Sequence, residues 1–118
     1  MHEMGIAMQI IEIALASIPD DLKNPRVERV NLKVGKLAAV VPESLHFCFQ
    51  IAAQDTPLCD ADLNIEEISL KVRCTDCNVE WTAHEPVFVC RKCNGRSVKM
   101  LSGRELDITS IEVVDEDA

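Results

Sequence analysis

Aromatic residues are scarce in this sequence of 118 residues, which contains three Phe, one Trp and no Tyr. This scarcity excludes a core built mainly on aromatic side chains. Apolar residues nevertheless make up 47% of the chain, and only 27% of the residues are charged, which excludes a wholly disordered chain. The sequence therefore predicts a folded chain whose core is aliphatic, built from Ile, Val, Leu, Met and Ala.

Two further absences concern membranes and secretion. No apolar run approaches the roughly 20 residues needed to cross a bilayer, because Gln9 and Glu12 interrupt the longest candidate, 5–18. The first lysine or arginine is Lys23, so the start lacks the basic segment of a secretory leader. We therefore expect a cytoplasmic protein that does not span a membrane. In a reducing compartment, its six cysteines indicate metal binding or thiol chemistry before a disulfide framework.

Hydrophobic periodicity predicts two helices. Apolar residues recur at spacings of three and four between residues 2 and 18, which is typical of an amphipathic helix. Pro42 and Glu43 suit the first turn of a second helix. Its expected buried side chains are Leu45, Cys48, Phe49 and Ala52.

Three main strands are predicted from alternation. Arg29 to Val34 alternates strictly between apolar and polar residues. Residues 63–72 and 106–113 also alternate, but each changes phase by one residue, which predicts a β-bulge in each strand. We expect an α+β fold in which two helices flank a small three-stranded mixed sheet. Its first two strands should be parallel and its last strand antiparallel to a neighbour.

Four of the cysteines form two C-x-x-C pairs, which lie between the second and third main strands. Cys74 and Cys77 make the first pair, and Cys90 and Cys93 make the second. Two intervening residues let a tight turn direct both sulfur atoms toward one ion, so the pairs predict a structural, zinc-ribbon-like site with four cysteine ligands. A thioredoxin-like redox pair is the alternative, but it needs a single reactive C-x-x-C at a helix start.

The predicted zinc site divides the chain into two expected domains. Residues 73–99 form the zinc-binding domain, with a small core of Trp81, Val87, Phe88 and Val89, and residues 1–72 plus 100–118 form the α/β domain. Four thiolates leave no open position on zinc for a water molecule, so we expect no hydrolytic chemistry there. No nucleophile and base pair occurs at a recognisable spacing, so we do not expect an enzyme.

The amino terminus is a candidate second metal site. The α-amine of Met1, a backbone amide and the imidazole of His2 lie within one or two chelate rings of each other, and Glu3 follows. Nitrogen-rich ligand sets of this kind favour square-planar Ni(II) or Cu(II). An exposed, mobile terminus without a metal is the alternative interpretation.

Several segments together resemble the HypA/HybF family of hydrogenase nickel-incorporation proteins. The resemblance covers nearly the whole chain and rests on the opening 1–4, the strand 30–37, the helix 42–47, the paired C-x-x-C segment, and the segments 103–106 and 111–113. It implies a nickel site of Met1, His2 and Glu3 and a structural zinc site of Cys74, Cys77, Cys90 and Cys93. It also implies a nickel metallochaperone that acts with a HypB-type GTPase and delivers nickel to the large subunit of [NiFe] hydrogenase. Homodimer formation and a role in urease maturation stay open.

This chain departs from the family pattern at one point. Some members carry His directly after each C-x-x-C, whereas this chain has Asn78 and Asn94. An acid-responsive exchange of thiolate for imidazole at zinc is therefore in doubt. We interpret His84 and His46 as surface residues, Cys48 as a small buried residue and Cys59 as a free thiol in a polar loop.

The main alternative function is a zinc-ribbon adaptor that binds a protein or a nucleic acid. Arg91, Lys92, Arg96 and Lys99 give the zinc-binding segment a local excess of positive charge. However, the chain as a whole carries 12 basic and 20 acidic side chains, a net charge of −8, which repels phosphate backbones. We therefore expect neither nucleic-acid nor membrane partners.

Overall fold

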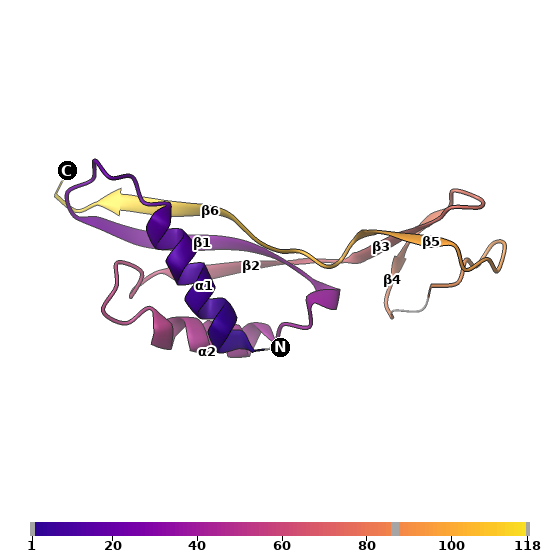
Figure 1. Ribbon diagram of the computed structural model, residues 1–118, viewed down its shortest axis with the longest axis horizontal. Helices are drawn as coiled ribbons and strands as arrows, with labels where there is room; N and C mark the ends of the chain where they lie inside the picture. The colour runs from indigo at the N-terminus through magenta and orange to yellow at the C-terminus, as the bar shows by residue number, and fades with distance from the viewer. Residues whose placement is uncertain (1, 86–87, 118) are drawn as a thin grey trace. The chain divides into compact units, whose positions relative to one another are not determined.

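The computed structural model describes residues 2–85 and 88–117 (Figure 1). Contacts within the chain divide it into two compact units. Unit 1 comprises Met1–Lys33, Val40–Glu66 and Asp107–Ala118, and unit 2 comprises Val34–Ala39 and Glu67–Leu106. The elements are α1 (Glu3–Ala16), β1 (Pro25–Gly35), the 3-10 helix η1 (Lys36–Ala38), α2 (Pro42–Ala52), β2 (Asp62–Ile68), β3 (Leu70–Cys74), β4 (Glu80–Ala83), β5 (Val98–Ser102) and β6 (Leu106–Asp115).

The first sheet has the strand order β2-β1-β6. Asn31 in β1 accepts a hydrogen bond from the Asn64 side chain of β2 at 2.9 Å, and Arg29 pairs with Asp62 at 3.7 Å, so β1 and β2 run parallel. The Gly35 N–H donates to the Glu105 carbonyl at 2.7 Å, whereas the Glu116 N–H donates to the Asn24 carbonyl at 3.0 Å. The β1–β6 pair is therefore antiparallel, and the predicted mixed sheet is confirmed.

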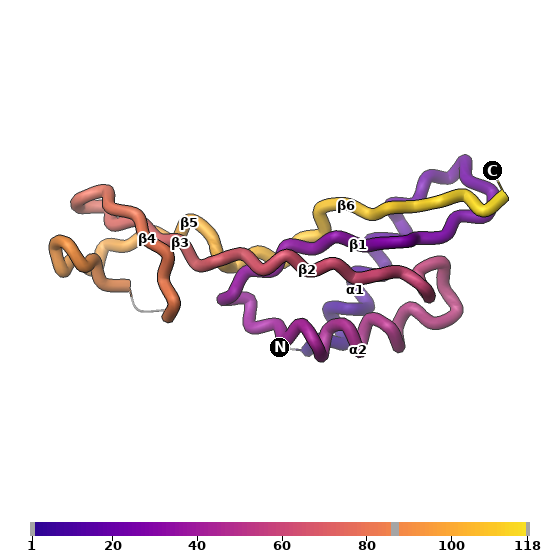
Figure 2. The backbone as a smooth tube through the Cα atoms, turned by 180° about the vertical axis from the view of Figure 1, so that it is seen from behind, coloured from indigo at the N-terminus to yellow at the C-terminus, as the bar shows by residue number. Residues whose placement is uncertain are grey.

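The core of unit 1 lies between this sheet and the helices. Figures 1 and 2 show α1 lying across one face of the strands. Its buried side chains have the predicted spacing and are Ala7, Ile10, Ile11 and Ala14. They pack in a core that includes Val30 and Leu32 of β1 and Leu45 and Phe49 of α2. None of the described helices is long and apolar enough to cross a membrane.

Unit 2 contains a second, fully antiparallel sheet with the strand order β4-β3-β5. Leu70, Val72 and Ala83 are buried at its centre, and five partly buried residues pack against them: Leu37, Trp81, Phe88, Val98 and Met100. Val87, which we expected in this core, lies outside the described residues, and Val89 is only half-buried. The predicted zinc-binding segment, 73–99, lies inside unit 2.

The predicted continuous strand over residues 63–72 is wrong. The chain forms β2 up to Ile68 and β3 from Leu70, and Ser69 belongs to neither strand. The phase of the apolar residues changes because Leu63 is buried in unit 1, whereas Leu70 and Val72 are buried in the second sheet. In contrast, residues 106–115 do form one strand, β6, whose partly buried positions change phase between Ile108 and Ile111.

Candidate metal centres

The two C-x-x-C pairs of unit 2 fold into two matching turns. In the first turn, the Asn78 N–H donates to the Cys74 carbonyl at 2.8 Å, and the Cys74 N–H donates to the Val79 carbonyl at 2.9 Å. In the second, the same two bonds join Asn94 to Cys90 at 2.8 Å and Cys90 to Gly95 at 2.9 Å. The Thr75 N–H and hydroxyl both donate to the Ser97 carbonyl at 2.8 Å, which ties the first turn to the segment after the second.

These turns bring four sulfur atoms together. The Cys74 and Cys93 sulfurs are 3.6 Å apart, the Cys77 and Cys90 sulfurs are 3.5 Å apart, and all four lie within 4.8 Å of one another. A tetrahedral ion with Zn–S bonds of about 2.3 Å requires sulfur atoms about 3.8 Å apart. The four-cysteine cluster therefore fits a structural zinc ion, which would occupy all four thiolates and keep no position for water.

The pKa values of the cluster's thiols differ widely. Backbone N–H groups of Cys93 and Lys92, with side-chain hydrogen bonds from Cys77 and Cys93, lower the pKa of the Cys90 thiol to about 6 despite its burial. The Gly95 N–H lowers the pKa of Cys93, but the neighbouring Cys74 and Cys90 sulfurs and burial outweigh it and raise that pKa to about 12. Thiolates are the ligands of a metal cation, so uptake of the cation must release the proton of Cys93.

Sequence analysis missed the role of the residue that follows each C-x-x-C. Asn78 and Asn94 have φ angles of 60° and 57°, in the left-handed region that Asn tolerates better than most side chains. Gly95 is constrained as well, because a Cβ atom there would lie 3.1 Å from the Cys93 sulfur. The repeated C-x-x-C-Asn pattern was the available signal. At these positions Asn serves the backbone turn.

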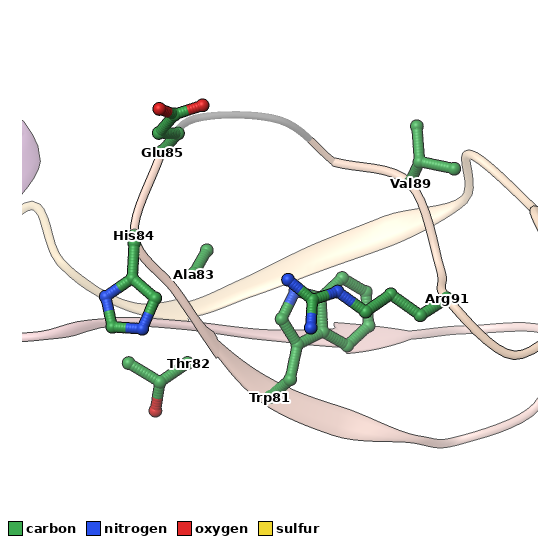
Figure 3. A pocket seen from close by; sticks show the side chains of 7 residues that line it. All are labelled: Trp81, Thr82, Ala83, His84, Glu85, Val89 and Arg91. Carbon is green, nitrogen blue, oxygen red and sulfur yellow. The ribbon is translucent and has the colours of Figure 1, made fainter.

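A shallow pocket of about 330 Å³ lies beside the second turn. Figure 3 shows Arg91 extending toward the indole of Trp81, with His84 and Glu85 at the other end. His84 is exposed, as expected for a surface residue, and is not part of the four-cysteine cluster.

The amino-terminal candidates lie in unit 1. Met1 lies outside the described residues. His2 is exposed and precedes α1, where its carbonyl accepts from the Ile6 N–H at 3.2 Å. Glu3 is half-buried in the first turn of α1, and its carboxylate accepts a hydrogen bond from the Val41 N–H at 3.4 Å. Thus the start of α1 is held beside the start of α2, and the imidazole of His2 is exposed.

The other candidate residues do not belong to the four-cysteine cluster. Cys48 in α2 is half-buried rather than fully buried as expected, and Cys59 is an exposed free thiol. His46 is half-buried on α2. Among the residues that the structure describes, the four-cysteine cluster is the single group of three or more His, Cys, Asp or Glu side chains placed to share a metal ion.

Comparison with known proteins supplies the context of these two sites. Residues 1–113 match the family model described as hydrogenase/urease nickel incorporation, metallochaperone, HypA. The chain is 58% identical over 113 residues to the hydrogenase maturation factor HypA of Desulfosudis oleivorans, covering 96% of this chain and 98% of the relative. It is 52% identical over 115 residues to the factor of the same name from Desulfatibacillum aliphaticivorans, covering 98% of this chain and 88% of the relative.

The fold also resembles a solved structure. The solution structure of the Ni metallochaperone HypA from Helicobacter pylori matches 98% of this chain and 100% of that chain, with a TM-score of 0.67 and 24% identity. At this identity the likeness concerns the fold, whereas the family model and the closely similar relatives extend over nearly the entire sequence. This chain therefore belongs to the HypA family of hydrogenase nickel-incorporation metallochaperones.

Proposed function

We propose that this protein binds Ni(II) at its amino terminus and delivers it, with a partner GTPase, to the large subunit of [NiFe] hydrogenase in the cytoplasm. The observation that carries the proposal is the family match over residues 1–113, in a family described for nickel incorporation. The ligands would be the Met1 amine, the His2 imidazole and Glu3. An enzymatic reaction is not part of this function, since the protein's task is to hold and release an ion.

Two local features support this assignment. His2 is exposed, so its imidazole is accessible to an ion and to a partner that removes the ion. Nitrogen ligands of the terminal segment suit Ni(II), whereas the four thiolates of unit 2 suit zinc, so the two sites differ in ligand chemistry. The zinc-ribbon adaptor for nucleic acid has no comparable support from the family match.

A nickel titration of three histidine variants tests the proposal. The chain contains three histidines, so His46→Ala and His84→Ala are matched controls for His2→Ala. Loss of one nitrogen ligand should weaken nickel binding by about 100-fold, the upper end of the effects seen when a supporting residue of a metal site is removed. Calorimetry with zinc-loaded protein measures the nickel affinity, and elemental analysis measures the zinc content.

We expect the two control variants to bind nickel like the parent, and all three variants to keep their zinc. Extension of the chain by three residues before Met1 should have the same effect as His2→Ala, because it removes the α-amine and keeps every side chain. Unchanged nickel affinity in His2→Ala, or in the extended protein, would contradict the proposed site.

A further inference from the structure

Unit 1 exposes an unusual concentration of large apolar side chains on its two helices. The described residues include nine exposed large apolar side chains, and seven of them lie on α1, on α2 or at the residue preceding α2. Met8 is 60% exposed and Phe47 is 58% exposed. Single exposed apolar residues are ordinary, so only those that lie together mark an interaction surface. We call the helix-pair surface the groove lined by Met8, Ile11, Glu12, Leu15 and Ala52, together with Met4, which lies on the same stripe of α1.

The helix-pair surface includes a groove between the helices. Met8, Ile11, Glu12 and Leu15 of α1 and Ala52 of α2 line a groove of about 380 Å³. The spacing of Met8, Ile11 and Leu15 places them on one stripe of α1. Methionine side chains are flexible and adapt to different apolar partners. The groove is thus suited to the apolar face of another helix.

The charges on the two helices indicate the charge that a partner segment should carry. Neither residues 1–22 nor residues 37–70 contain a lysine or an arginine, and both helices lie within these segments. Apart from histidine, the ionisable side chains of the two helices that carry a charge near neutral pH are all acidic: Glu3, Glu12 and Glu43. Glu12 itself lines the groove. An apolar groove with a carboxylate in its lining, on helices that contain no lysine or arginine, is complementary to a basic amphipathic segment.

We propose that the helix-pair surface docks a basic amphipathic helix of a partner protein. The partner's apolar side chains would lie along Met8, Ile11 and Leu15, and its lysine or arginine side chains would face Glu12. Two copies of this surface repel each other because both carry only acidic charges, and an anionic membrane repels it for the same reason. The charge pattern therefore favours a basic protein segment over a second copy of this chain and over a membrane.

The location of the surface gives this docking a consequence for nickel transfer. Met4 directly follows the proposed ligands His2 and Glu3, and Val41 donates to the Glu3 carboxylate at 3.4 Å. A helix docked along α1 would begin beside the proposed nickel site. This consequence rests on the proposed function, whereas the docking itself does not require nickel.

A synthetic peptide tests the docking without nickel. The probe is an 18-residue Leu/Lys peptide with the helical amphipathic pattern. Its controls are the same pattern with Glu in place of Lys and a scrambled Leu/Lys sequence. Fluorescence anisotropy with zinc-loaded protein measures binding. We expect the Leu/Lys helix to bind at least tenfold more tightly than either control peptide.

Matched variants locate the binding surface. Leu15 and Leu101 are 39% and 38% exposed, so Leu15→Gln in α1 and Leu101→Gln in unit 2 make equal changes at different places. Glu12→Lys and Glu80→Lys form the corresponding charge pair, since both glutamates are exposed. We expect Leu15→Gln and Glu12→Lys to weaken peptide binding about tenfold, which is about 1.4 kcal/mol. Leu101→Gln and Glu80→Lys should leave it unchanged.

Three results would overturn the proposal. The first is absence of binding, or equal binding of the acidic peptide. The second is equal loss of binding in both members of a matched pair. The third is a dimer in sedimentation experiments that Leu15→Gln dissociates, because a second copy would then cover the surface. None of these results depends on nickel, so they are distinct from a failure of the His2→Ala titration.

Discussion

Gly35 of unit 2 lies so close to the backbone of Gly103 that its position has no room for a larger residue. A Cβ atom at Gly35 would lie 2.1 Å from the carbonyl carbon and oxygen of Gly103. Gly103 itself has a φ of 127°, which side chains rarely adopt. The approach is tight because the Leu37 N–H donates to the Gly103 carbonyl at 2.8 Å. These glycines allow the 34–39 segment to join unit 2.

Gly35→Ala should therefore destabilise unit 2. The neighbouring atoms are backbone, which cannot move aside cheaply, so we expect the free energy of unfolding to fall by about 3 kcal/mol, near the upper end for overpacking. Urea unfolding of the zinc-loaded protein, followed by Trp81 fluorescence, measures this loss. Gly5→Ala is the control, because a Cβ at Gly5 in α1 meets no atom within 4 Å, and it should not lower the urea midpoint reported by Trp81. An unchanged urea midpoint for Gly35→Ala would contradict the steric argument.

The left-handed asparagines lead to a second prediction, on zinc affinity. Asn78 has a φ of 60° directly after Cys77, and a β-branched residue is strongly disfavoured there. Asn78→Val should cost about 1–2 kcal/mol and lower the zinc affinity by about tenfold. Competition with a colorimetric chelator measures this affinity. Asn78→Gly is the matched control and should bind zinc like the parent, so equal affinities for the Val and Gly variants would show that the turn geometry does not matter.

At the scale of the elements, periodicity and spacing predicted the two helices, the mixed sheet and the four-cysteine cluster. These features depend on local patterns: the spacing of Ala7, Ile10, Ile11 and Ala14 on α1, and two residues between the cysteines of each pair. The split of residues 63–72 between two sheets was not predictable in the same way. A one-residue phase change is equally compatible with a β-bulge and with a strand that leaves one core for another, because the pattern does not identify the neighbours of the strand.

The candidate sites show the same limit. The zinc cluster could be predicted because all its ligands belong to two short turns. The approach of Glu3 to Val41 could not, since it joins the first turn of α1 to the residue before α2 through tertiary packing. Periodicity separated the buried stripe of α1 from its other residues, but it did not show that some of the remaining apolar side chains line a groove. Ala14 belongs to that stripe and is buried, whereas the packing of α1 beside α2 determines that Leu15 is exposed and lines the groove.

At the scale of the whole molecule, charge and core size are divided unequally between the units. Unit 1 contains 15 acidic and 4 basic side chains, whereas unit 2 contains 5 acidic and 8 basic side chains. Unit 1 has 12 buried apolar residues among those described, and unit 2 has only 5 besides its cysteines. An acidic unit with a substantial core is thus combined with a weakly basic unit whose core is small. Small cores need additional stabilisation. We therefore expect zinc to be essential for the folding of unit 2 but not for the folding of unit 1.

Two spectroscopic signals separate the units in the intact protein. Trp81 is the single tryptophan of the sequence and belongs to unit 2, whereas α1 and α2 belong to unit 1. Tryptophan fluorescence therefore reports on the zinc-binding unit, and circular dichroism at 222 nm reports mainly on the helices. Removal of zinc with a strong chelator should shift the Trp81 emission to the red, as expected for a solvated indole, and should leave most of the helical signal.

Cysteine variants provide the matched controls for zinc removal. Cys74→Ser removes a buried member of the cluster and should reproduce the effect of the chelator on Trp81, whereas Cys59→Ser removes an exposed thiol outside the cluster and should change neither signal. Structural zinc contributes about 10–16 kcal/mol in zinc-finger peptides, far more than the small core of unit 2 is expected to supply. Unfolding transitions that coincide in urea for both signals after zinc removal would mean that the two units fold as one cooperative structure, and our division of stability would be wrong.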